Sequence, residues 1–209
     1  MTLSFSMKNR LVIAWLILLS SGIAFIFWQY QWKYSLPTPV PAHYHDVSRG
    51  TPVMLPASAR ILRSSGEKPL FLHFFNPDCP CSRFNMPQFK ALVDQYSDKV
   101  DFAIVVMSPK SFTATELQNK FGLSHPLPVL RDSAVAAACG VYSTPQAVLI
   151  DARGQLYFRG NYNRSRYCTD ERTGFAKQAL DGLLQGNYSL TFSLQALKAY
   201  GCQLPECTR

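Results

Sequence analysis

Short apolar runs alternate along this chain with segments in which apolar residues recur every three or four positions. The runs predict buried strands, and the three- and four-residue spacing predicts helices that bury one face. We expect strands at 70–75, 100–107, 128–131, 146–150 and 155–159, and helices at 82–96, 113–121, 133–139 and 170–184. Strands that alternate with helices and end in a hairpin plus helix predict an α/β sandwich, parallel in its first part and antiparallel in its last.

The N-terminal part carries a different pattern. Residues 11–28 contain no charge, follow the basic Lys8 and Arg10, and lead into an aromatic cluster at 28–32. A bilayer span needs roughly 17–25 apolar residues and is often flanked by aromatic residues. A cleaved signal peptide is the alternative, but its apolar region is usually about 7–15 residues long and ends in small residues. This region ends in Phe-Ile-Phe-Trp, so we expect an uncleaved single-pass anchor with its N-terminus in the cytoplasm.

Composition divides the chain into four parts, and its charge distribution indicates which partners to expect. The predicted parts are the anchor (1–33), a Pro-rich tether and lead-in (34–65), the α/β domain (66–186) and a cysteine-containing tail (187–209). The net charge is +8, but the basic residues outside the anchor are scattered, so no nucleic-acid partner is expected. Six cysteines in an exported chain fit an oxidising compartment, where disulfides persist.

Two cysteines follow the first strand of the predicted domain. Cys79 and Cys81 lie where the strand ends and a helix begins, and Pro80 between them suits the first helical position because it has no N–H to lose. Unpaired N–H groups and the helix dipole stabilise a thiolate there and lower the pKa of a cysteine. The position therefore predicts reactive thiols, with an inactive structural turn as the alternative. His73, inside the apolar strand, is expected to be a core histidine.

The pattern as a whole resembles the thioredoxin fold, and within it the membrane-anchored, periplasm-facing thioredoxin-like thiol–disulfide oxidoreductases of bacteria. The residues that carry the resemblance are Cys79 after the strand, Pro87 eight residues later, and Thr144-Pro145 before the hairpin. The resemblance covers about residues 66–186. It implies a central mixed sheet flanked by helices behind an N-terminal transmembrane helix. It also implies a cis Thr144–Pro145 bond packed against the thiols, with both residues shaping the substrate groove.

The cysteine turn departs from that family. The family's second cysteine falls on Ser82, whereas this chain has Cys81 one position earlier, in Cys-Pro-Cys-Ser. If resolution takes place within the turn, Cys81 is the resolving thiol. A disulfide across one intervening residue closes a small strained ring that is easily reduced, so we expect an oxidising or isomerising potential. Alternatively, Cys79 attacks alone and Cys81 serves another purpose.

The other four cysteines allow three pairings, and sequence alone cannot choose among them. We expect Cys202 and Cys207 to close a loop in the tail, and Cys139 to pair with Cys168 or to remain free. A resolving role for Cys168 is the alternative that bears most directly on catalysis.

The favoured function is thiol–disulfide exchange with protein thiols and disulfides at the outer face of the bacterial inner membrane. Electrons would come from a membrane or periplasmic donor, and no bound cofactor or metal is required. A thiol peroxidase is the second hypothesis, because residues 157–162 resemble a stretch of peroxiredoxin-like proteins. However, Asn76 and Leu72 stand where that signature has Thr and Pro. A Cu(I)-binding assembly factor is the third, since the soft thiolates Cys79 and Cys81 suit that ion. Those families use Cys-x-x-x-Cys with a histidine near the hairpin, and this chain has neither.

Overall fold

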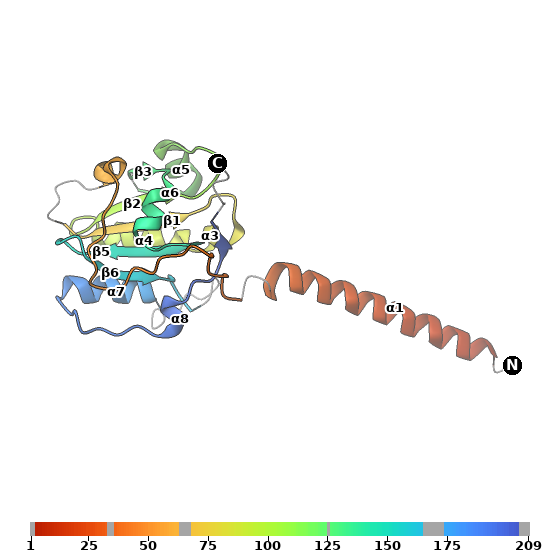
Figure 1. Ribbon diagram of the computed structural model, residues 1–209. Coiled ribbons are helices and arrows are strands. Elements are labelled where there is room, and N and C mark those ends of the chain that lie inside the picture. Colours follow the sequence, from red (N-terminus) through yellow and green to blue (C-terminus); the bar gives the residue numbers. More distant parts are fainter. Residues whose placement is uncertain (1–2, 33–35, 63–67, 125, 165–173, 205–209) are drawn as a thin grey trace. The chain divides into compact units, whose positions relative to one another are not determined.

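The computed structural model describes residues 3–32, 36–62, 68–124, 126–164 and 174–204 (Figure 1). The chain forms two compact units, Met1–Leu36 and Pro37–Arg209.

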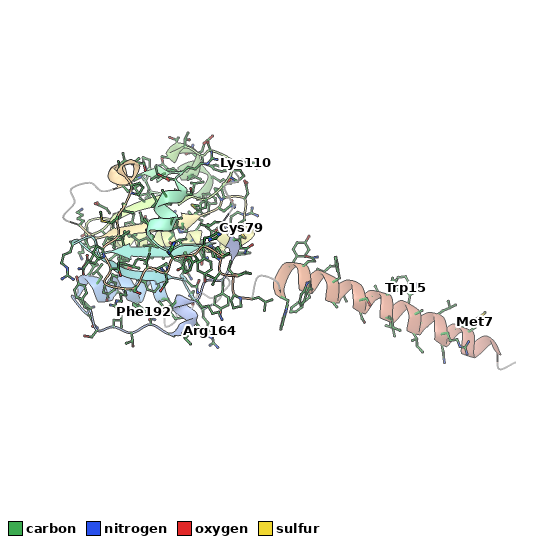
Figure 2. All side chains as sticks on the ribbon, in the orientation of Figure 1. Met7, Trp15, Cys79, Lys110, Arg164 and Phe192 are labelled. Carbon is green, nitrogen blue, oxygen red and sulfur yellow. A yellow bond between two sulfur atoms is a disulfide. The ribbon has the colours of Figure 1, made fainter. Side chains whose placement is uncertain are left out.

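The first unit is a single long helix. α1 (Leu3–Phe27) continues into one turn of π-helix, η1 (Trp28–Trp32), in which the Trp28 and Trp32 rings stack with their centroids 6.3 Å apart. Side chains such as Met7 and Trp15 project outward from α1 (Figure 2). The span Met7–Tyr30 is long and apolar enough to cross a membrane. It is compatible with a single-pass anchor or with a signal sequence.

The second unit is built on a five-stranded mixed sheet, as the sequence predicts. The strand order is β3-β2-β1-β5-β6. β1 pairs parallel with β2 and antiparallel with β5, β2 pairs parallel with β3, and β5 pairs antiparallel with β6. The strands are β1 (Leu70–Phe75), β2 (Asp101–Val106), β3 (Val129–Leu130), β5 (Gln146–Ile150) and β6 (Leu156–Gly160).

Helices cover both faces of this sheet and make two apolar cores. Because side chains alternate along a strand, Phe71 and Phe75 of β1 face one core while Leu72 and Phe74 face the other. The first core is closed by α4 (Met86–Tyr96), α5 (Ala114–Phe121) and α7 (Phe175–Leu184). The second core is closed by α6 (Ser133–Ala138) and the 3₁₀-helix η2 (Ala57–Leu62). The fold is therefore thioredoxin-like α/β.

The helix predicted at 82–96 is two helices in the structure. α3 (Pro80–Phe84) ends before Asn85, and α4 starts at Met86. The reason is Pro87, which has no N–H to donate and whose ring would clash with the carbonyl of the residue four positions earlier in a continuous helix. The helix predicted at 170–184 begins at Phe175, and the residues 170–173 lie outside the described part of the chain.

Two short strands form a second, smaller sheet. β4 (Ser143–Thr144) directly precedes β5, and β7 (Cys202–Gln203) lies near the end of the described chain. They pair antiparallel, with Ser143 opposite Gln203 and Thr144 opposite Cys202. β7, the dark blue arrow in Figure 1, follows α8 (Leu194–Leu197). The tail thus runs back over the domain to the end of the sheet that carries the cysteine turn.

Candidate redox site

Cys79 occupies the position that the sequence predicts, between β1 and α3. It is the N-cap residue of α3, with Pro80 in the first turn, and only 5% of its surface is exposed. The backbone N–H of Cys79 donates to the Asn76 carbonyl at 3.0 Å. The hydroxyl of Ser82 is buried and accepts a hydrogen bond from the Asn76 N–H at 3.2 Å. Ser82, which stands where the family has its second cysteine, therefore stabilises the turn through this hydrogen bond.

Cys79 forms a disulfide with Cys202, which lies 123 residues later in the sequence. This corrects two expectations from the sequence. The predicted Cys202–Cys207 pairing is wrong, because Cys202 bonds to the turn cysteine. The partner of Cys79 in this state is also not Cys81. The sequence could not show this, because the pairing depends on the path of the tail over the folded domain.

The remaining cysteines take different positions. Cys139 follows α6, is fully buried and is free, which is one of the two states expected for it. Burial raises the pKa of the Cys139 thiol to about 12, and the nearby Arg159 guanidinium offsets only part of this rise. The backbone of Cys81 belongs to α3. Cys168 and Cys207 lie outside the described residues, so a resolving role for Cys168 stays a prediction.

The Thr144–Pro145 peptide bond is cis, which confirms the expectation carried by the Thr-Pro motif. Ser143 and Thr144 are buried beneath the tail strand, at 0% and 1% exposed. Gly201 of the tail packs so closely on them that a Cβ atom there would overlap the Thr144 carbonyl oxygen and lie 3.3 Å from Cδ of Pro145. The tail therefore lies directly on the cis-proline segment, and Cys202, the next residue of the tail, bonds to Cys79, which is labelled in Figure 2.

The start of the second unit supports the same part of the tail. Thr38 is buried, and its N–H donates to the Ala199 carbonyl at 2.9 Å. The Thr38 hydroxyl lies 2.9 Å from that of Ser143 and donates to the Gly201 carbonyl at 3.3 Å. One side chain thus links the tether, β4 and the tail.

Asn161, just after β6, holds the tail at residues 195–198, which precede the residues held by Thr38. Its N–H donates to the Ala196 carbonyl at 2.8 Å. Its side-chain amide donates to the carbonyls of Gln195 at 2.8 Å and Lys198 at 2.6 Å. These three hydrogen bonds fix α8 and the residues after it onto the sheet, so the path that leads to Cys202 is set by two anchors.

Other polar residues of β1 and of the turn after it have structural partners. The Asp78 carboxylate pairs with the Lys110 ammonium group at 3.3 Å on the surface. His73 is fully buried, stacks on Phe89, and its Nδ1 lies 2.6 Å from the Tyr162 hydroxyl. Burial lowers the pKa of His73 to about 3. The stretch 157–162, which resembles peroxiredoxin-like proteins, covers most of β6 and the two residues after it, and its aromatic residues Tyr157, Phe158 and Tyr162 pack in the first core.

The site offers disulfide chemistry. Among the described residues, no group of three or more His, Cys, Asp or Glu side chains is arranged to hold a metal ion. The group that can take part in this chemistry is the Cys79–Cys202 disulfide. Cys79 is the N-cap residue of α3, and Cys202 belongs to the two-residue strand β7. Such a disulfide can accept two electrons from a dithiol: the first thiolate attacks it to form a mixed disulfide, and the second thiol then resolves that intermediate.

Three residues of this site were missed by sequence reasoning as parts of it: Cys202 as the partner of Cys79, Thr38 and Asn161. Thr38 and Asn161 act through long-range contacts that leave no local pattern. For Cys202 a weak signal existed, since a glycine can mark the close approach of another backbone, and Gly201 precedes Cys202.

Comparison with known proteins agrees with this architecture. The chain belongs to the family described as domain of unknown function DUF6436, whose model matches residues 52–204. It is similar to the thiol–disulfide oxidoreductase ResA of Halalkalibacterium halodurans, with 27% identity over 96 residues. That match covers 46% of this chain and 54% of the relative, so the chain matches about half the length of this relative.

Two solved structures share the fold. An uncharacterized conserved protein from Geobacillus kaustophilus is 19% identical, covers 82% of this chain and 100% of its own, and superposes with a TM-score of 0.61. A hypothetical protein from Sinorhizobium meliloti 1021 is 18% identical, covers 77% of this chain and 96% of its own, and has a TM-score of 0.57.

Proposed function

We propose that this protein is a membrane-anchored thiol–disulfide oxidoreductase that acts on protein thiols and disulfides through Cys79. The observation that carries the proposal is the position of Cys79. Cys79 is the N-cap residue of a helix that follows a buried strand. Its disulfide partner, Cys202, lies opposite Thr144, and Thr144 is followed by the cis Pro145. The similarity of 96 residues to a thiol–disulfide oxidoreductase supports the same chemistry.

The exchange needs a second thiol. Cys81 is the candidate that the sequence suggests, and Cys202 is the candidate that the structure adds. In either case Cys79 attacks a substrate disulfide, or as a disulfide is attacked by a substrate thiolate, and a mixed disulfide is the intermediate.

The proposed location is the bacterial inner membrane, with the Pro37–Arg209 unit in the periplasm. It is supported by the disulfide itself and by the apolar helix, whose uncharged run 11–28 is preceded by Lys8 and Arg10. In intact spheroplasts, an added protease should digest the second unit while a tag placed before Met1 stays protected. Protection of the second unit would contradict this location.

The activity is tested with the full-length protein in detergent and a disulfide-containing model protein such as insulin. With dithiothreitol as the electron source, we expect catalysed reduction that Cys79→Ser lowers by about a hundredfold or more, because the attacking thiolate is gone. Cys139→Ala is the matched control and should retain the rate. Equal rates for wild type and Cys79→Ser would overturn the proposed function.

A further inference from the structure

The tail strand lies where an extended substrate would be expected to dock. A peptide that adds to a sheet edge does so through main-chain hydrogen bonds, with its side chains in flanking pockets. β7 pairs in this way with β4, the strand that leads into the cis-proline, and places Cys202 opposite Thr144 (Figure 1). Substrate and tail therefore compete for the same edge.

The disulfide completes this likeness to a bound substrate. A substrate caught during exchange would pair with β4 and bond its sulfur to Cys79. The tail does both, through β7 and Cys202. The oxidised protein thus has the arrangement of an intramolecular mixed disulfide.

The anchors of the tail are hydrogen bonds that do not involve the disulfide cysteines. Asn161 holds residues 195–198, and Thr38 holds Ala199, so only a few residues separate Cys202 from fixed points. A group held by such a short linker has an effective concentration near its partner in the millimolar range or above. Cys202 is therefore available to return to Cys79 whenever β4 is free.

We propose that Cys202 is the resolving thiol of Cys79 and that β7 displaces the bound substrate strand as it resolves the mixed disulfide. This inference rests on the proposed function of Cys79 and names the second thiol of the same site. It assigns to the tail strand a substrate-like position and a part in product release.

The electrons balance over two exchanges. The Cys79 thiolate attacks one sulfur of a protein disulfide, forms a mixed disulfide with it and releases the other sulfur as a thiolate, which takes a proton from water. The Cys202 thiolate then attacks Sγ of Cys79, forms the Cys79–Cys202 bond and releases the first sulfur, which is also protonated. Two electrons pass from the cysteine pair to the substrate. A dithiol protein that attacks Cys79 reverses the two steps and restores the pair.

This route leaves the turn undisturbed. Resolution by Cys81 would close a ring across Pro80 alone, within the first turn of α3. Resolution by Cys202 uses a strand pairing that is already complete in the structure.

A single-turnover experiment tests the assignment. The full-length protein in detergent is reduced, freed of reductant and mixed with a symmetrical disulfide of a short labelled peptide. Wild type should release two peptide thiols per protein and end with Cys79 bonded to Cys202, as mapped by mass spectrometry. Cys202→Ser should release one peptide and keep the other on Cys79, with the second release at least tenfold slower. Cys139→Ala should match wild type.

The outcomes separate this inference from the function on which it rests. If Cys81→Ser retains the peptide and Cys202→Ser releases both, Cys81 resolves the intermediate and the inference is overturned, while attack by Cys79 still stands. If Cys79→Ser releases the first peptide as fast as wild type, the proposed function itself fails.

A second variant tests the strand rather than the sulfur. In Gly201→Ala the new Cβ would overlap the Thr144 carbonyl, and the glycine φ of +141° is one that other residues rarely adopt, so β7 should no longer dock. The second peptide release should slow by at least tenfold although Cys202 is present. Gly154→Ala is the control, since that glycine also has a positive φ, +81°, but no atom within 4 Å of the new Cβ. A Gly201→Ala protein that resolves at the wild-type rate would overturn the part assigned to β7.

Discussion

Cys79 and Cys139 are both buried, at 5% and 0% exposed, but different parts of the fold cover them. Cys139 lies in the second core, among apolar residues contributed by the five-stranded sheet. Cys79 lies under the tail, which contacts β4 through a strand of two residues.

The difference shows that burial has two consequences for a thiol. Removing Cys139 from its surroundings would require opening the sheet core, so its thiol remains neutral and unreactive. Uncovering Cys79 requires only reduction of one disulfide and release of a short strand. On the proposed function, the same fold holds one cysteine inert and keeps the other available for exchange.

The largest expected effect is on alkylation. In the oxidised protein neither cysteine should react with iodoacetamide at pH 8. After reduction, Cys79 should react at least about a hundredfold faster than Cys139, because a thiol whose pKa is about 12 is only about one part in ten thousand thiolate at that pH. Peptide mapping by mass spectrometry gives both rates from one sample. Comparable rates for the two cysteines in the reduced protein would show that the comparison is wrong.

A second expected effect is on stability, where the Cys79–Cys202 disulfide and the free Cys139 should contribute differently. The Cys79–Cys202 bond joins residues 123 apart and restricts the unfolded chain. Cys202→Ser should therefore lower the free energy of unfolding by about 2–4 kcal/mol without reductant. Urea unfolding in detergent, followed by circular dichroism, measures this change.

The matched control uses the same reductant. With dithiothreitol present, wild type and Cys202→Ser should become nearly equal, because the bond is lost in both. Cys139→Ala removes only packing, so its cost should be the same with and without dithiothreitol. A loss in Cys202→Ser that reductant does not change would mean that the disulfide is not its cause.

A smaller effect, on the pH dependence of stability, is expected from His73, which lies on the same sheet face as the first core. Burial lowers the pKa of His73 from 6.5 to about 3, so between these values the unfolded chain binds a proton that the native state does not. Stability should then fall as the pH falls, by up to about 1.4 kcal/mol per pH unit within this window. Urea unfolding of wild type and His73→Phe at pH 7 and pH 5 measures the contribution.

His73→Phe should depend less steeply on pH than wild type does. His45→Phe, at an exposed position, is the control and should keep the wild-type slope. Equal slopes in all three proteins would show that His73 is not held neutral by the core.

The smallest effect concerns the hold of Thr38 on the tail. Thr38→Val removes the hydroxyl that contacts Ser143 and the Gly201 carbonyl, a loss of about 1 kcal/mol. The released tail should become about fivefold more populated in the reduced protein, and Cys202 should be alkylated faster by the same factor. Thr51→Val, at an exposed position, should leave the rate unchanged. If Thr38→Val also leaves it unchanged, the tether does not hold the tail strand.

The sequence alone determined the elements whose signals are local. The run Leu70–Phe75 is apolar at every position, and it is a fully buried strand in the structure. The helix predicted at 113–121 forms at Ala114–Phe121, and it begins with a capping box in which the Glu116 N–H donates to the Thr113 hydroxyl and the Thr113 N–H donates to the Glu116 carboxylate. The cysteine turn was predicted from the strand before it, and the cis Thr144–Pro145 bond was implied by the resemblance to the thioredoxin fold.

Only the tertiary structure decided which cysteines meet. Cys79 and Cys81 are neighbours in sequence, yet Cys79 bonds to Cys202, because Asn161 and Thr38 direct the tail across the sheet to β4. No periodicity predicts a two-residue strand, and no spacing encodes a contact between residues 123 positions apart. Local patterns fix strands and helices because their energies come from neighbouring residues. A disulfide to the tail depends on where the whole domain places its chain end.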